Sequence, residues 1–319
     1  MGIIKSLFGG KAEKPAEEKS KRQMQIEFET LKYDGIRAQR LRRLPFARKC
    51  LEEAIKLQDD YETYGYLAQV LVEMGELEAA LEPLKHMTEA EPMIAENYIS
   101  LANVYYMLED YQEMADKAQL AIDIDHQNAQ AYYLKGKAAH AMNEYGEAES
   151  LLSKAIQLRA DYAEALLLRG EVYLRQGQLD DALQDAEGVI VSGREVDSGL
   201  LLRGAVHEVQ EQMDEAEADY RQVLELDPFN QQAYLNLGKL YCRQERFEDA
   251  IDVMGDAIEM SPVFADAYAL RAEAKKQIGD TEGAAKDATS AANLQAAGEV
   301  QTEVEDPAAS IKEIDIMHL

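Results

Sequence analysis

The sequence predicts an all-α protein built from helical hairpins that repeat every 34 residues. Three observations support this prediction. Among 319 residues only 7 are proline and 19 glycine, while 47% are hydrophobic, so long helices form easily and a core can be buried. Small residues recur at a fixed period, and large apolar residues recur between them. Turn residues divide each period into two halves.

The small residues fix the period, because they occupy the same place in seven successive units without an insertion. One column reads Ala68, Ala102, Gly136, Gly170, Gly204, Gly238 and Ala272. A second column follows twelve positions later and reads Ala80, Met114, Ala148, Ala182, Ala216, Ala250 and Ala284. Small residues at one period indicate that two helices of each unit cross so closely that bulk would not fit between them.

Large apolar residues open the helices that flank each small column. The first helix of each unit carries Tyr64, Tyr98, Tyr132, Leu166, Leu200, Tyr234 and Tyr268 near its start. The second helix starts with Leu77, Tyr111, Tyr145, Leu179, Met213 and Phe247. Pairs such as Gly75-Glu76 and Gly177-Gln178 separate the two helices and are typical of turns. Each unit is therefore expected to be a helical hairpin.

One unit carries all eight positions of a known repeat signature, in Tyr234, Leu237, Gly238, Tyr241, Phe247, Ala250, Ala257 and Pro262. In these positions the chain resembles the tetratricopeptide repeat family. The resemblance covers 61–298, and a degenerate earlier unit extends it back to residue 28. It implies an α-solenoid of about eight helix-turn-helix units forming a right-handed superhelix, with units near 28–60, 61–94, 95–128, 129–162, 163–196, 197–230, 231–264 and 265–298.

The net charge of -28 is divided unevenly along the chain. Residues 1–49 contain 13 basic and 6 acidic side chains, whereas the remainder contains 20 basic and 55 acidic ones. Because the main body would repel phosphates, nucleic acid is excluded as its partner. Two distant cysteines, Cys50 and Cys242, indicate a reducing compartment, and no apolar run is long enough to cross a bilayer. The sequence thus predicts a cytoplasmic protein.

No arrangement of residues predicts catalysis, a cofactor or a metal site. His207-Glu208 begins a string that lacks the second histidine of a zinc-binding HExxH motif, and His207 occupies a column that tyrosine fills elsewhere. The repeats also leave too few residues at either end for a catalytic domain. The sequence therefore favours a non-enzymatic scaffold that binds a protein or peptide.

Family resemblance assigns ligand binding to certain places of the first helix in each unit, which line the concave side of the superhelix. In this chain those places hold aromatic, amide and charged residues, a mixture suited to holding an extended peptide. The candidate groove residues are Tyr66, Gln69, Asn103, Tyr106, Tyr133, Lys137, His140, Glu171, Arg175, Asn236, Lys239 and Arg243. The alternative is that each is ordinary solvated helix surface.

Both ends have their own predicted roles. Residues 1–27 form a basic segment expected to be flexible, and its first 22 residues combine apolar and lysine side chains that suit weak contact with an anionic membrane surface. The alternative function is accordingly that of a membrane-peripheral assembly or regulatory factor. Residues 299–319 form an acidic tail that turns apolar, and it is expected either to cap the last repeat or to enter the groove.

Overall fold

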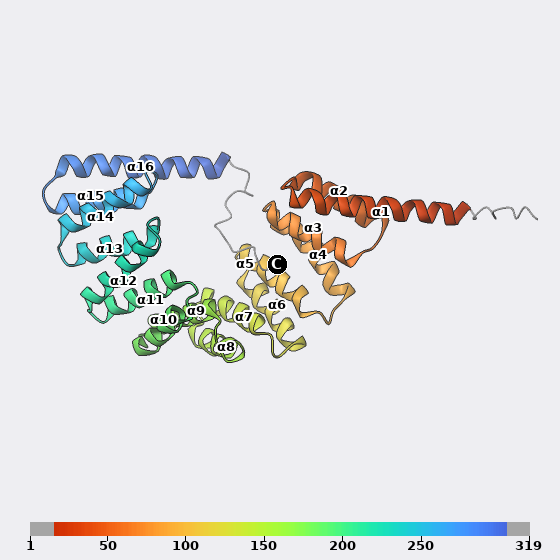
Figure 1. The fold of residues 1–319 in the computed structure, drawn as a ribbon, viewed down its shortest axis with the longest axis horizontal. Helices are drawn as coiled ribbons and strands as arrows, with labels where there is room; N and C mark the ends of the chain where they lie inside the picture. Colours follow the sequence, from red (N-terminus) through yellow and green to blue (C-terminus); the bar gives the residue numbers. More distant parts are fainter. Residues whose placement is uncertain (1–15, 305–319) are drawn as a thin grey trace, which may run out of the picture. The chain divides into compact units, whose positions relative to one another are not determined.

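The computed structural model describes residues 16–304, which form sixteen α-helices and contain no strand. They follow one another in antiparallel pairs (Figure 1). The described residues divide into two compact units, 16–97 and 98–304. In order, the helices are α1 Ala16–Arg40, α2 Leu44–Leu57, α3 Tyr61–Glu73, α4 Leu77–Ala90, α5 Ala95–Met107, α6 Tyr111–Ile124, α7 Ala129–Ala141, α8 Tyr145–Leu158, α9 Ala163–Gln176, α10 Leu179–Ser192, α11 Val196–Val209, α12 Met213–Leu226, α13 Gln231–Arg243, α14 Phe247–Met260, α15 Ala265–Gln277 and α16 Thr281–Val304.

Odd-numbered helices are the first helices of the hairpins and even-numbered helices are the second. Three of the first helices begin with a capping side chain, because Asp or Asn accepts a hydrogen bond from a backbone N–H in the first turn. These capping residues are Asp60, Asn128 and Asn230, and Asp110 caps the second helix α6 in the same way. Short polar side chains between the hairpins therefore set where many of these helices start.

Every turn from α3–α4 to α15–α16 contains one residue in the left-handed region, always at the same place of the repeat. These residues are Gly75, Glu109, Asn143, Gly177, Glu211, Glu245 and Gly279. The turn closes with a backbone bond such as that from Asp110 N to Tyr105 O, at 2.9 Å. A left-handed conformation suits glycine, whereas it costs a glutamate about 1 kcal/mol. The hairpin geometry is thus retained even where the residue is unfavourable.

The small columns lie at the contact between the two helices of each hairpin. In the second column Ala80, Met114, Ala148, Ala182, Ala216 and Ala250 have no exposed surface. Gly204 shows why the first column is small, since a Cβ added there would lie 2.6 Å from the Tyr220 ring. Tyr220 is itself fully buried, and its hydroxyl donates to Glu208 at 2.6 Å. Helix α11 can therefore approach α12 only where it carries no side chain.

Three of the last four hairpins are also joined by a buried ion pair between their two helices. The pairs are Arg169–Asp185, Arg203–Asp219 and Arg271–Asp287, with shortest N–O distances of 2.7, 2.5 and 2.8 Å. The hairpin of α13 and α14 has Leu237 and Val253 at these two places, and both are buried in its core. Burial raises the pKa of Asp185 in spite of the bonds from Arg169, so the charged pair is costly to bury.

The structure differs from the sequence prediction in two places. Helix α1 begins at Ala16, before the predicted start of the repeats at residue 28, and α16 continues to Val304 as one helix. The membrane-contact prediction for the first 22 residues and the cap beyond residue 304 fall largely outside the described residues.

Gly204→Ala and Gly188→Ala form a matched pair of substitutions. Alanine at 204 is expected to destabilise the protein by about 1 kcal/mol or more, because its methyl group meets the Tyr220 ring. Alanine at 188, whose Cβ would contact only Leu166 at 3.7 Å, is expected to stabilise helix α10 by about 0.5–1 kcal/mol. Thermal unfolding followed by circular dichroism measures both, and equal shifts for the two variants would contradict this account.

Exchanging the Arg169–Asp185 pair for the residues of the α13–α14 hairpin tests whether the ion pair is needed. Asp185→Val alone leaves a largely buried guanidinium unpaired and is expected to cost about 2 kcal/mol or more. The double variant Arg169→Leu with Asp185→Val is expected to recover most of that loss. Unfolding midpoints decide the matter, and a double variant no more stable than the single one would refute the exchange.

Candidate functional site

The twelve predicted groove residues all lie on first helices. Within the second compact unit, first helices of successive hairpins contact one another: α7 contacts α9, α9 contacts α11 and α13 contacts α15. The second helices of successive hairpins do not approach each other as closely. Helices that crowd together on one side form the inner side of a curved stack. We call the exposed faces of the first helices of the second unit the inner surface. It holds ten of the twelve residues, while Tyr66 and Gln69 belong to α3 of the first unit.

Lys137 of α7 lies between two tyrosines on the inner surface. Its Nζ is 3.6 Å from the centre of the Tyr106 ring and 6.0 Å from that of Tyr133. Burial lowers the pKa of Lys137, and no hydrogen bond or ion pair joins it to any described residue. The rings stabilise the ammonium group through cation–π contact but do not neutralise its charge.

His140, Glu171 and Arg175 continue the inner surface beside Lys137. Burial and the charge of Arg175 both lower the pKa of His140, and its Nε2 is buried without a hydrogen-bond partner among the described residues. Surrounding protein also raises the pKa of Glu171, although this side chain is exposed.

Tyr133 packs against residues that the repeat pattern did not predict as part of the site. Its ring lies 5.0 Å from that of Tyr162, and the Arg159 guanidinium lies 3.3 Å from the Tyr162 ring. Burial raises the pKa of both tyrosines, that of Tyr162 to about 12. Tyr162 lies just before α9, outside the places assigned to ligand binding, so the family pattern could not point to it. Its turn position beside Arg159 was the only available signal.

The remaining predicted residues are less available. Arg243 forms an ion pair with Glu208 at 2.6 Å, and Asn236 accepts a hydrogen bond from Gln232 at 2.7 Å. Lys239 is exposed, while Asn103 and Gln69 are half-buried. The structure thus brings together Tyr106, Tyr133, Lys137 and His140 on neighbouring helices. The predicted residues of α13 lie apart from them, and two of these, Arg243 and Asn236, are already bound to other side chains of the chain.

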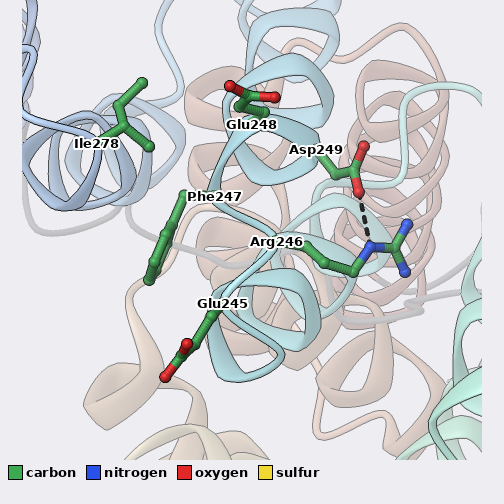
Figure 2. A pocket seen from close by; sticks show the side chains of 6 residues that line it. All are labelled: Glu245, Arg246, Phe247, Glu248, Asp249 and Ile278. Carbon is green, nitrogen blue, oxygen red and sulfur yellow. Dashed lines mark hydrogen bonds and ion pairs between the residues drawn. The ribbon is translucent and has the colours of Figure 1, made fainter.

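A hollow at the start of α14 is a second candidate site (Figure 2). Figure 2 shows Arg246 and Asp249 on one side of the ribbon and Phe247 and Ile278 on the other. The Arg246 guanidinium binds Asp249 at 2.6 Å and Glu217 at 2.7 Å. Burial acts to raise the pKa of Glu217, but hydrogen bonds from Tyr241, Arg246 and Arg221 outweigh it and lower the pKa. The contacts of Arg246 therefore join the start of α14 to Glu217 of α12.

The described residues contain no group of three or more His, Cys, Asp or Glu side chains that could hold a metal ion. Across 16–304 no helix combines the length and apolar character needed to cross a membrane.

Comparison with known proteins bears on the family. No curated protein matches the chain. A structure from Parabacteroides merdae, described as a tetratricopeptide repeat protein, is 20% identical with a TM-score of 0.62, covering 77% of this chain and 98% of its own. The APC/C hetero-tetramer Cut9-Hcn1 is 15% identical with a TM-score of 0.57, covering 84% and 53%. Pseudomonas aeruginosa pilF is 16% identical with a TM-score of 0.56, covering 69% and 99%.

These likenesses concern the fold, and a family model matches part of the chain. A family model described as tetratricopeptide repeat matches residues 139–184 and 210–274. Those residues lie in hairpins whose helices keep the 34-residue period through the second unit. The resemblance predicted from the repeat signature is therefore confirmed for residues 139–184 and 210–274, which match the tetratricopeptide repeat.

Proposed function

We propose that the chain is a non-enzymatic scaffold that holds an extended segment of a partner protein against the inner surface of its second unit. The observation that carries the proposal is Lys137, a half-buried ammonium group lying near the rings of Tyr106 and Tyr133 with no ion-pair partner among the described residues. A buried polar group without a partner is unusual enough to need a reason. A ligand that supplies an acceptor to Lys137 gives one.

Contrast with the rest of the second unit supports this reading. Between the helices of three hairpins, buried charges such as Arg169 and Asp185 are paired at short distances. On the inner surface Lys137 and the Nε2 of His140 have no such partner among the described residues. Lys137 therefore differs from these paired charges in lacking an oppositely charged partner within the described part of the chain.

The side chains beside Lys137 suit a peptide. Tyrosine rings offer a large, stiff contact area with a polar end, and Tyr106, Tyr133 and Tyr162 supply three of them. Asn103 lies on the same helix as Tyr106 and is half-buried, so its amide can bond a peptide backbone. Each first helix presents only a few such groups, so an extended segment crossing several helices would contact more of them than a compact ligand.

The test is capture of partner proteins from the native cell by the full chain and by Tyr106→Ala with Tyr133→Ala. Loss of two central aromatic contacts is expected to weaken retention of the partner about tenfold or more. Leu120→Ala with Val191→Ala is the matched control, because both residues are exposed on second helices. Partners that the tyrosine variant retains as well as the control does would move the binding surface elsewhere.

A further inference from the structure

The first compact unit contains a hollow that the repeat pattern does not predict as a binding site. It lies between α1 and α3 and is lined by Tyr33, Ile36, Arg37, Arg40, Glu62 and Tyr66. Tyr33, Arg37 and Arg40 are four and three residues apart, which places them on one face of α1. Only Tyr66 of this group was among the predicted groove residues, since the first hairpin matches the repeat signature poorly.

Charge in the hollow is positive. Its one carboxylate, that of Glu62, is bound by Lys32 at 2.5 Å, and Lys32 also binds Asp60 at 2.9 Å. Arg37 is 3.9 Å from Asp34, which is too long for a strong ion pair between exposed groups. Arg40 has no ion-pair partner among the described residues. Among the described residues Arg40 is therefore unpaired and Arg37 makes only one long contact, in a chain whose net charge is -28.

The walls of the hollow are aromatic and its floor is apolar. Tyr33 is 60% exposed and faces the hollow together with Tyr66, whereas Ile36 is only 9% exposed. A guanidinium group binds a carboxylate through two parallel hydrogen bonds, and a tyrosine ring packs on the aliphatic part of a neighbouring side chain. The combination fits a short peptide that carries carboxylates beside apolar residues.

We propose that this hollow binds an acidic segment of a partner protein, with Arg37 and Arg40 each holding a carboxylate. The inference rests on the proposed function, in which faces of first helices hold protein segments, and it names the chemistry that the first unit selects. A flat bilayer contacts a protruding surface better than a hollow. A nucleic acid would bring a continuous row of phosphates to Glu62 and to the acidic repeats, which repel it.

The experiment uses the full chain and a fluorescent synthetic peptide of about twelve residues in which Glu and Asp alternate with Leu and Tyr. Fluorescence anisotropy is expected to show binding at about 50 mM NaCl that weakens severalfold at about 500 mM. The same peptide with Gln and Asn in place of its acids is expected not to bind. Arg37→Glu with Arg40→Glu is expected to weaken binding about tenfold or more, because attraction becomes repulsion.

The matched control is Lys49→Glu with Lys85→Glu, which changes the net charge equally but on exposed places of α2 and α4. It is expected to bind within about threefold of the unchanged chain, because the two altered charges are outside the hollow. Equal loss in both double variants would overturn the inference, since binding would then follow net charge alone. Absence of peptide binding would overturn it too, as would binding of RNA or anionic vesicles in the peptide's place.

Failure of this inference and failure of the proposed function have different signatures. Tyr106→Ala with Tyr133→Ala alters only the second unit and is expected to leave binding of the acidic peptide unchanged. Captured partners that depend on Tyr106 and Tyr133, combined with no binding of the acidic peptide, would overturn the inference alone. Peptide binding that is lost in the arginine variant, combined with partners indifferent to the tyrosines, would support the inference and count against the proposed inner surface.

Discussion

The close approach of two helices inside each hairpin is the constraint on which the rest of the structure depends. Gly204 lets the Tyr220 ring reach the backbone of α11, and Gly136 does the same for Leu152 of α8. Because each hairpin presents the same narrow contact, hairpins stack at one spacing and their first helices fall side by side. The surface proposed for ligand binding exists only because this spacing repeats, so residues far from any ligand determine its form.

Much of the fold could be predicted from the sequence because the determining residues are local and periodic. Second helices begin at Leu77, Tyr111 and Tyr145, the residues that the pattern singled out. The extent of α1 before residue 28 was missed, since its charged start carries no small or apolar column.

The sequence predicted on which helices the candidate site residues lie, but not which of their charges are paired within the chain. The pattern put Lys137 and Arg243 on first helices, where both lie. It could not show that Arg243 is paired with Glu208 while Lys137 has only aromatic rings beside it, because these contacts join different helices. Arg37 and Arg40 were overlooked for another reason, namely that the first hairpin departs from the signature, so that no place in it could be matched to the groove.

The hairpin of α13 and α14 has a consequence for how the chain responds to temperature. Its Leu237 and Val253 replace the charged pair of its neighbours, so its cohesion is almost wholly hydrophobic. Hydrophobic attraction weakens on cooling, whereas the penalty for burying charges falls on heating. The stability of this hairpin therefore follows temperature through apolar burial, whereas that of the hairpins beside it also follows the changing cost of keeping charges out of water.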